Sequence, residues 1–163
     1  MTIEIHPEAR VSRLADIEDS VRGTRIAIGA GCMIDSFVKI KPVGGSGDVI
    51  LGQRVFVNSG CVIYSGNGVR IGNDVAIAAN CVFAAANHAF QERGRLIREQ
   101  RFAASRGGIV IEDDVWIGAG CVFLDGAIVR RGAVIGAMSL VRGEVAEYSI
   151  SYGNPLRTVG SRR

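Results

Sequence analysis

The feature that most constrains this chain is an apolar residue that recurs at every sixth position. The first residue of each hexad is branched or aromatic, and the fifth is small or β-branched. From residue 111 the hexads read IEDDVW, IGAGCV, FLDGAI, VRRGAV, IGAMSL and VRGEVA. Earlier units in the same register are VNSGCV, IGNDVA, IAANCV and FAAANH, with IHPEAR, VSRLAD, IEDSVR, IGAGCM and IDSFVK upstream. Short insertions near Gly23–Ala27, Gly44–Ile50 and Gly68–Arg70 interrupt the register without ending it.

A period of six fits neither an amphipathic helix nor an alternating surface strand. It fits a short strand followed by a tight turn, with three hexads to one coil of a triangular prism. The 22 glycines suit such corners, and an aromatic content of 6% suits a narrow core of small and β-branched residues. The pattern resembles the hexapeptide-repeat left-handed parallel β-helix over almost the whole chain. We therefore expect an all-β fold.

The repeat indicates a single β-helix domain over residues 1–163, with one long insertion and a short C-terminal tail at 154–163. The insertion, residues 89–110, contains no hexad and is rich in arginine. Long insertions in a solenoid project from one face, which is often the binding face. For most of the charges in this loop, a solvated surface is the simpler interpretation.

Charge and cysteine content narrow the functional classes. The net charge of +3 is too small and scattered to indicate nucleic-acid binding, and no apolar run is long enough to span a membrane. The four cysteines all fall at fifth positions of hexads, without the clustering of a zinc site or a disulfide framework. They are expected to be small core residues of a cytoplasmic protein that binds no metal.

Several motifs in order along the chain carry a more specific resemblance. They are NHAF at 87–90, IREQ at 97–100, IVIEDDVWIG at 109–118 and YSISYGNP at 148–155. In this register they resemble the maltose, galactoside and polysaccharide O-acetyltransferases of the hexapeptide-repeat acyltransferase superfamily. The resemblance implies a homotrimer in which acetyl-CoA and a sugar or glycan acceptor meet between neighbouring prisms. Because hexads begin by Ile5, the shorter enzymes of polysaccharide biosynthesis are the expected branch.

His88 is the candidate general base. Transfer of an acetyl group to a hydroxyl requires a base beside the alcohol, and histidine is suited to that role near neutral pH. His88 ends the last hexad before the loop, whereas His6 lies near the N-terminus beside Pro7 and is expected to be an exposed terminal residue. The competing interpretation of His88 is a polar residue that starts a loop.

Other site residues come from the resemblance. It places the oxyanion donor at the backbone N–H of Ala119, and it aligns Asn58 with an acceptor-binding asparagine. Asn58 is equally well explained as a corner-turn asparagine. Asn87 and Gln100 match the polysaccharide-type pattern and are expected to orient His88 or the sugar. An aspartate of the galactoside enzymes falls near Gly66 here, which favours a different acceptor.

The resemblance also implies a coenzyme site with no metal. Trp116, the only tryptophan, is expected to pack against the pantetheine arm, although a structural corner cap explains it almost as well. The backbones of Ala119 and Ala137 line the same arm. Arg142 and Arg157 are the matched cations for the phosphates, but the usual Thr-Lys pair is replaced by Arg142–Gly143. Arg162 and Arg163 are the alternatives.

The sequence leaves three other functions to consider. One is N-acetylation of a nucleotide-linked amino sugar, and another is a non-catalytic trimeric scaffold. The third, a zinc carbonic anhydrase on the same prism, requires three histidine ligands, and the chain has two histidines. The preferred prediction is an acetyl-CoA-dependent sugar O-acetyltransferase.

Overall fold

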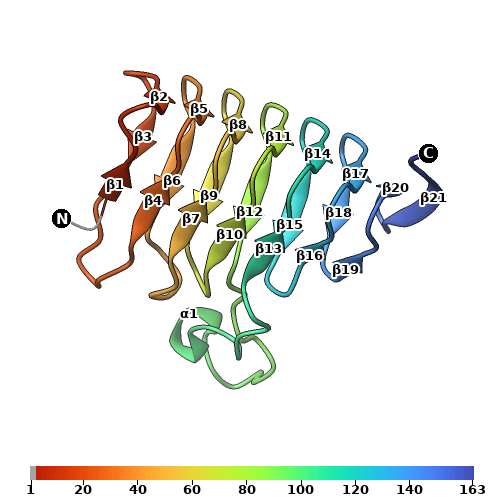
Figure 1. Ribbon diagram of the computed structural model, residues 1–163. Helices are drawn as coiled ribbons and strands as arrows, with labels where there is room; N and C mark the ends of the chain where they lie inside the picture. Colours follow the sequence, from red (N-terminus) through yellow and green to blue (C-terminus); the bar gives the residue numbers. More distant parts are fainter. Residues whose placement is uncertain (1–2) are drawn as a thin grey trace.

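The computed structural model describes residues 3–163, which wind into a prism of stacked coils (Figure 1). Each coil contributes one short strand to each of three parallel sheets, which confirms the predicted left-handed parallel β-helix. Sheet A contains β1 (Ile3–Ile5), β4 (Ile26–Ile28), β7 (Val49–Leu51), β10 (Val69–Ile71), β13 (Ile109–Ile111), β16 (Ile128–Val129) and β19 (Glu144–Val145).

The other two sheets complete the prism. Sheet B contains β2 (Arg10–Val11), β5 (Met33–Ile34), β8 (Phe56–Val57), β11 (Ala76–Ile77), β14 (Trp116–Ile117), β17 (Val134–Ile135), β20 (Ser149–Tyr152) and β21 (Arg157–Ser161). Sheet C contains β3 (Asp16–Ile17), β6 (Lys39–Lys41), β9 (Val62–Tyr64), β12 (Val82–Ala84), β15 (Val122–Leu124) and β18 (Leu140–Val141). The α1 helix (Ile97–Gln100) is a single turn in the long loop.

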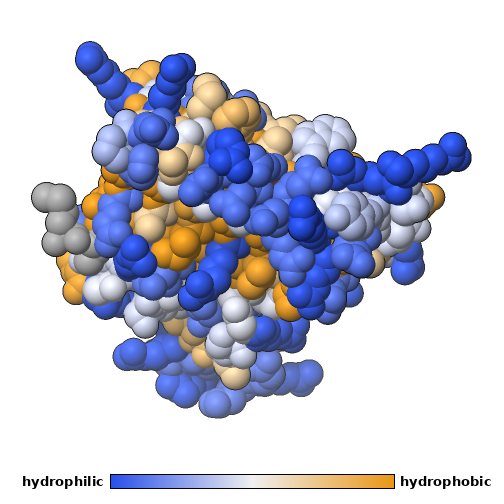
Figure 2. Space-filling model, in the orientation of Figure 1, coloured by the Kyte–Doolittle hydropathy of each residue, from blue (hydrophilic) through white to orange (hydrophobic). Residues whose placement is uncertain are grey.

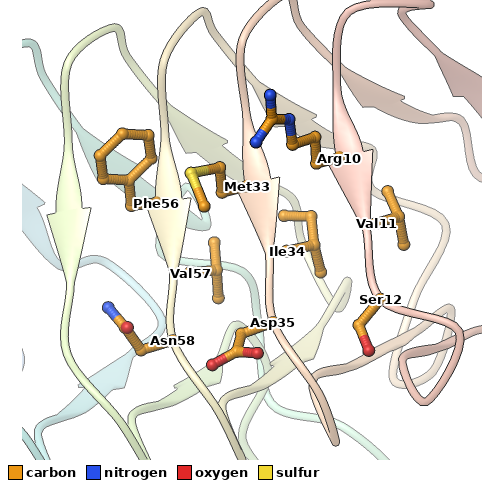
Figure 3. A pocket seen from close by; sticks show the side chains of 9 residues that line it. All are labelled: Arg10, Val11, Ser12, Met33, Ile34, Asp35, Phe56, Val57 and Asn58. Atoms are coloured by element: carbon orange, nitrogen blue, oxygen red, sulfur yellow. The ribbon is translucent and has the colours of Figure 1, made fainter.

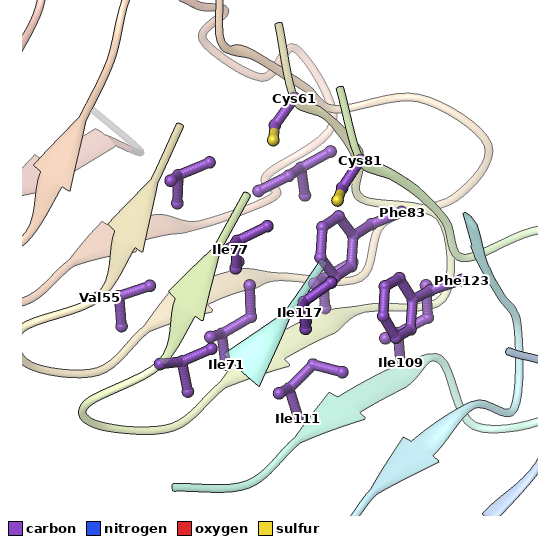
Figure 4. Packing of buried hydrophobic residues seen from close by; sticks show 14 of the residues in the cluster. Val55, Cys61, Ile71, Ile77, Cys81, Phe83, Ile109, Ile111, Ile117 and Phe123 are labelled. Carbon is purple, nitrogen blue, oxygen red and sulfur yellow. The ribbon is translucent and has the colours of Figure 1, made fainter. Parts of the chain in front are cut away.

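The core is formed by the two hexad positions that the sequence pattern selects. From residue 111 onward, every first-position and fifth-position side chain is at most 3% exposed, and Ser139 is the only polar one among them. Equivalent residues of successive coils stack on one another, as the rings of Phe83 and Phe123 do in Figure 4. The repeat therefore determines what is inside the prism.

The cysteines are buried free thiols, as predicted for the fifth position. Cys61, Cys81 and Cys121 form one column at the corner between sheets B and C, and each thiol points to a backbone carbonyl. Cys32 lies at another corner, where its sulfur is 3.4 Å from the backbone nitrogen of Val55. These contacts assign the cysteines to packing.

The insertions all fall at one corner, where the chain passes from sheet C to sheet A. We call this the C–A corner. The connections there vary widely in length and comprise residues 18–25, 42–48, 65–68, 85–108, 125–127 and 142–143. The connections at the two other corners are all three or four residues long. The longest insertion consequently projects from the prism with α1 at its tip (Figure 1).

A buried carboxylate ties the returning end of this loop to the prism. Asp125 is 2% exposed, and its oxygens accept hydrogen bonds from the backbone nitrogens of Arg106 and Gly108, both at 2.8 Å. The side-chain amide of Asn67 donates a third bond to it at 3.0 Å. The long loop is therefore held at its base by the coils on either side.

The hexad that precedes the loop ends sooner than its sequence suggests. Ala85 is fully buried, whereas Asn87, predicted at a fifth position, is half-buried beside the loop. In this hexad, as in those of Ser65 and Asp125, the third position at the C–A corner is buried. The chain thus leaves the prism after Ala85.

The C-terminal segment, expected to be a tail, contains a strand. After a cis peptide bond between Asn154 and Pro155, β21 turns back and pairs antiparallel with β20. It thereby covers the C-terminal edge of sheet B.

Candidate functional site

His88 lies at the base of the long loop with its ring orientation fixed. Its Nδ1 is 3.1 Å from the carbonyl oxygen of Arg101, and an isolated antiparallel bridge joins it to Phe102. The two rings are 5.0 Å apart between centroids. A carbonyl oxygen only accepts, so Nδ1 carries the proton and Nε2 holds the lone pair. This tautomer leaves a basic nitrogen on an exposed ring.

The carbonyl that orients His88 comes from an unusual backbone conformation. Arg101 follows α1 with φ 62° and ψ −135°. Positive φ is costly for a residue with a Cβ, and such strain concentrates at functional positions. The same carbonyl accepts the backbone N–H of Ala89 at 3.0 Å. The strained residue therefore closes the loop onto the histidine.

A cavity of about 270 Å³ lies beside the ring. It is lined by residues from both ends of the loop and from the next coil, including Asn87, His88, Phe90, Arg106, Asp125 and Arg142. The apolar part of the wall suits the face of a sugar ring, and the two arginines make the cavity electropositive.

The two other predicted residues near the loop, Gln100 and Asn87, form hydrogen bonds with the loop backbone. The Gln100 side chain bonds to the backbone nitrogen of Glu92 and to the carbonyls of Glu92 and Arg95, at 3.0 to 3.1 Å. It holds the loop together and has no contact with His88. The carbonyl of Asn87 accepts the N–H of Ala103 at 2.7 Å, and its side chain lines the cavity.

A second set of predicted residues lies around sheet B and the corner between sheets B and C. Trp116 is on the outer face of β14 and is 52% exposed. Ala119 and Ala137 occupy equivalent turns of consecutive coils, and neither backbone N–H donates a hydrogen bond within residues 3–163. Asn58 lies at the same corner in an earlier coil, where its side chain donates to the Ile77 carbonyl at 2.7 Å.

The predicted coenzyme cations are divided between the two regions. Arg142 lines the cavity beside His88, whereas Arg157 lies in β21 at the end of sheet B. Arg162 contacts Asp114 at 2.9 Å and the Gly132 carbonyl at 3.0 Å. Because it is engaged in this way, Arg162 is less suited than Arg157 to bind a phosphate.

A groove of about 470 Å³ runs along the outside of β2, β5 and β8 (Figure 3). Met33 and Phe56, which are each nearly half exposed, form its apolar part. Asp35 and Asn58 lie at its opposite side. Hydrogen bonds from the Ser59 hydroxyl and the Ser36 backbone hold the pKa of Asp35 below its usual value, so this edge is anionic.

The candidate base and the candidate oxyanion donor lie beyond opposite ends of the strands of sheet C. A strand of this sheet runs from the corner that holds Ala119 to the corner that leads to His88, on the order of 15 Å of extended chain. One chain therefore presents the two predicted halves of a site on different corners.

The sequence interpretation missed two residues that shape this region. Asp125 is the third residue of the hexad FLDGAI, and nothing in the repeat marks it, because Arg131 also precedes a glycine in its hexad and is exposed. Arg101 was one arginine among five in the loop. No periodicity indicated that its carbonyl would meet His88.

Two further observations concern metals and membranes. Among residues 3–163, no group of three or more His, Cys, Asp or Glu side chains is placed to hold a metal ion. Over the same range, no helix has the length and apolar character needed to cross a bilayer.

Comparison with known families adds to this geometry. Residues 108–143 match the family model described as bacterial transferase hexapeptide, six repeats. The match covers the coils that follow the loop, and the coils before it repeat the same structure. Residues 108–143 therefore carry the repeat of the bacterial hexapeptide transferases, and the chain resembles the hexapeptide-repeat acyltransferase superfamily.

Curated members of this superfamily resemble the chain at moderate identity. A putative lipopolysaccharide biosynthesis O-acetyl transferase, WbbJ of Escherichia coli, is 29% identical over 142 residues, which cover 84% of this chain and 69% of that protein. The galactoside O-acetyltransferase of Lactococcus lactis is 28% identical over 68% of this chain and 52% of its own length. A probable acetyltransferase of Mycobacterium tuberculosis is 30% identical over 72% of this chain. The chain spans only 38% of that protein.

Solved structures of this superfamily share the fold. A variant of AntD, an N-acyltransferase from Bacillus cereus, was solved with dTDP-4-amino-4,6-dideoxyglucose and coenzyme A. It aligns with a TM-score of 0.81 and 25% identity over 99% of this chain and 84% of that chain. A hexapeptide-repeat acetyltransferase from Vibrio cholerae, VCA0836, aligns with a TM-score of 0.66 and 29% identity over 80% of this chain and 69% of that chain.

Proposed function

We propose that this protein is an acetyl-CoA-dependent O-acetyltransferase that acts on a hydroxyl of a sugar or cell-surface polysaccharide precursor, with His88 as general base. The observation that carries the proposal is the contact between His88 Nδ1 and the Arg101 carbonyl, which leaves Nε2 as the basic atom beside a cavity. The O-acetyltransferases among the relatives support the reaction class.

The reaction needs no covalent intermediate on the protein. His88 Nε2 takes the proton of the acceptor hydroxyl while the oxygen attacks the thioester carbon. The C–S bond then breaks, and the proton passes to the thiolate, which gives an O-acetyl sugar and free CoA. The backbone N–H of Ala119 is proposed to stabilise the oxyanion, because this exposed amide has no acceptor within the described chain. The four thiols are buried and cannot act as nucleophiles.

The coenzyme is proposed to lie along sheet B and the neighbouring corner. Trp116 offers an exposed aromatic face for the pantetheine arm, and the free amides of Ala119 and Ala137 can donate to its carbonyls. Arg157 is proposed to meet a phosphate. Arg142 lies beside His88 instead, so its proposed partner is the end of the coenzyme or the acceptor that reaches the cavity.

A homotrimer would unite the two halves of the site. Bringing the C–A corner of one protomer against sheet B of the next would place His88 opposite Ala119, which one chain alone separates. The outward positions of sheet B support this contact because they are apolar after Arg10, namely Met33, Phe56, Ala76, Trp116, Val134 and Ile150. The sheet A face instead carries ion pairs such as Arg25–Glu4 and Arg130–Glu144.

The proposed contacts with the acceptor follow from where Asn87, Asn58 and Gln100 lie in the structure. Asn87 lines the cavity and is proposed to hydrogen-bond the sugar. Asn58 uses its amide nitrogen to hold a turn, so its free oxygen is the proposed acceptor contact from a neighbouring subunit. Gln100 is proposed to act indirectly by keeping the loop folded.

A second candidate function keeps the chemistry and changes the nucleophile. The fold match with AntD, which was solved with a nucleotide-linked amino sugar, favours N-acylation of such an acceptor. A non-catalytic trimer is the remaining alternative. For either enzyme we propose a cytoplasmic location, which the four free thiols support.

The experiment that tests the proposal measures CoA release from acetyl-CoA with hydroxyl and amine acceptors, using wild type, His88→Gln and His6→Gln. Loss of a general base lowers kcat by roughly 10²–10⁴-fold, so His88→Gln should be nearly inactive. His6→Gln should retain full activity, because His6 lies in the first coil, away from the loop. Full turnover by His88→Gln, or no transfer by wild type to any acceptor, would refute the proposal.

A further inference from the structure

The excess positive charge of this protein is confined to the long loop. The whole chain has 19 Lys and Arg against 16 Asp and Glu. Residues 89–108 contain five arginines and two glutamates, so the rest of the chain has 14 basic residues (19 less 5) and 14 acidic residues (16 less 2). The projecting loop therefore carries a charge of +3 on an otherwise balanced molecule, and it is largely hydrophilic at the bottom of the view in Figure 2.

Four of these five arginines have guanidinium groups without a hydrogen bond or ion pair among residues 3–163, and Arg98 and Arg101 are the two that lie beside Arg95. The side chain of Arg95 donates to the Glu99 carbonyl at 2.7 Å and lies 4.0 Å from the Glu92 carboxylate. The side chains of Arg98 and Arg101 form no hydrogen bond or ion pair with any residue in the range 3–163. Elsewhere, exposed arginines are of both kinds: Arg25, Arg54 and Arg130 are paired with carboxylates, whereas Arg70 is not.

The guanidinium groups of Arg98 and Arg101 lie in the same pocket. Arg95, Arg98, Glu99 and Arg101 line an open pocket of about 510 Å³. Three arginines and one glutamate give this pocket a net charge of +2. Guanidinium forks match phosphate oxygens in pairs, and their charge does not titrate near neutral pH.

Arg101 connects this pocket to the candidate base. Its side chain lines the arginine pocket, whereas its carbonyl holds His88 Nδ1 at 3.1 Å. In this structure Arg101 has a positive φ of 62°, with its side chain toward the arginine pocket and its carbonyl toward His88. Arg101 thus contributes its side chain to the arginine pocket and its carbonyl to the orientation of His88.

We infer that Arg98 and Arg101, positioned with the help of Arg95, form a subsite for a phosphate group carried by the sugar acceptor. The inference rests on the proposed function and narrows its substrate class to phosphate-linked sugars. Within one chain the proposed coenzyme contacts Trp116, Ala119 and Arg157 lie around sheet B and not on the loop. Kinetics separate the two ligands, because a subsite for a coenzyme phosphate would change kcat/KM alike for phosphorylated and neutral sugar acceptors. Sugar 1-phosphates and nucleoside-diphosphate sugars present the same chemistry.

The kinetic test compares one sugar in three forms: its nucleoside diphosphate, its 1-phosphate and its neutral methyl glycoside. For wild type, the ratio of kcat/KM between a phosphate form and the glycoside should exceed tenfold and fall with added salt. In Arg98→Gln and in Arg101→Gln this ratio should drop at least tenfold, mainly through KM. The control Arg13→Gln/Arg22→Gln removes two exposed arginines outside the loop and should keep the wild-type ratio. An unchanged ratio in both loop variants would overturn the inference.

The two phosphate forms distinguish the sources. A drop for the nucleoside-diphosphate sugar alone assigns the subsite to the diphosphate of a nucleotide, and a drop for both assigns it to the anomeric phosphate. Either result supports the inference.

A binding measurement separates this inference from the proposed function. Inorganic pyrophosphate, titrated by calorimetry, should bind wild type, His88→Gln and the Arg13→Gln/Arg22→Gln control alike. It should bind Arg98→Gln and Arg101→Gln at least tenfold more weakly. If the protein acetylates nothing but shows this pattern, the subsite stands and the enzyme proposal fails. If it acetylates sugars and pyrophosphate binds all variants equally, the subsite is wrong and the enzyme proposal stands.

Discussion

The rings of Phe83 and Phe123 stack face to face, with centroids 4.8 Å apart and planes within 5°. The two residues are 40 positions apart and flank the long loop in sequence, yet they occupy the same register position on neighbouring strands β12 and β15. The prism therefore continues across the insertion without a shift. The loop that holds the candidate base is attached to an undisturbed core.

The stacked pair predicts a large effect of truncation. Phe123→Ala should lower the free energy of unfolding by about 3–5 kcal/mol, because it removes a fully buried ring and leaves a cavity against Phe83. Denaturant unfolding followed by circular dichroism measures the change. Phe90→Ala, at a phenylalanine that is 65% exposed, should alter stability by less than about 1 kcal/mol. Equal losses at both positions would contradict the assignment.

Asp125 predicts a coupling between the prism and the loop. In Asp125→Ala the backbone N–H groups of Arg106 and Gly108 lose their acceptor, so the free energy of unfolding should fall by about 2–4 kcal/mol. Trypsin should also cleave the loop after Arg93 or Arg95 faster than in wild type, as resolved by mass spectrometry. Asp16→Ala, at an exposed partner of Lys39, is the control. A loop equally resistant in both variants would show that Asp125 does not anchor it.

Two glycines give a matched pair. A Cβ at Gly66, which has φ 45°, would lie 2.5 Å from the backbone of Ala85, whereas a Cβ at Gly94 meets nothing within 4 Å. Gly66→Ala should therefore cost more than about 2 kcal/mol of stability, and Gly94→Ala less than about 0.5 kcal/mol. Thermal melting of both variants decides this. A stable Gly66→Ala protein would mean that the C–A corner tolerates a side chain.

The cysteine column predicts chemical inertness. The contact with the Cys121 thiol lowers the pKa of Cys81, but the Cys61 thiol and burial raise it further, to about 11. The Cys81 thiol and burial raise the pKa of Cys121. The Cys81 thiol lowers the pKa of Cys61 instead, so its protection rests on burial. Because all four thiols are buried, a thiol reagent at pH 8 should label none of them until the protein unfolds. Mass spectrometry before and after denaturant shows the difference. Rapid labelling of the native protein would contradict the packing described.

An ion pair at the sheet A corner predicts a dependence of stability on pH. The Arg130 guanidinium, and then the backbone N–H of Arg131, hold the pKa of Glu112 below its usual value of 4.5. Because the folded pKa is the lower one, the ionised carboxylate stabilises the fold above pH 4.5 and loses this effect as the pH falls through the folded pKa. Glu112→Gln should melt slightly below wild type at neutral pH, and the two should coincide at about pH 3. If the melting temperatures of Glu112→Gln and wild type still differed at about pH 3, the ion pair of Glu112 would not explain the difference.

Much of the prism was predictable because one rule repeats. Apolar first positions and small fifth positions face a common interior, so the burial of residues such as Ile117 and Cys121 follows from the period alone. Asn87 was placed at a fifth position by extending that period two residues too far. In that hexad the third-position residue Ala85 is buried and the chain then leaves the prism, which the period cannot indicate.

The candidate site was only partly predictable, for a related reason. The position of His88 at the end of a repeat was visible in the sequence, but its partner Arg101 lies 13 residues away across an aperiodic loop. The contacts of Asp125 likewise depend on where the loop returns. Contacts that depend on the path of a loop cannot be predicted from the period of the sequence.

Strand β21 bears on how the ends of this molecule behave. A solenoid exposes the edges of all its sheets at each end, and such edges can add further strands and grow into fibres. Here β21 runs antiparallel across the last parallel strand of sheet B, while β18 and β19 end sheets C and A. A second prism that approached this end would meet an antiparallel strand at the edge of sheet B, so a continuous run of parallel coils across the junction is blocked. The reversed strand thus limits end-to-end aggregation without lengthening the prism.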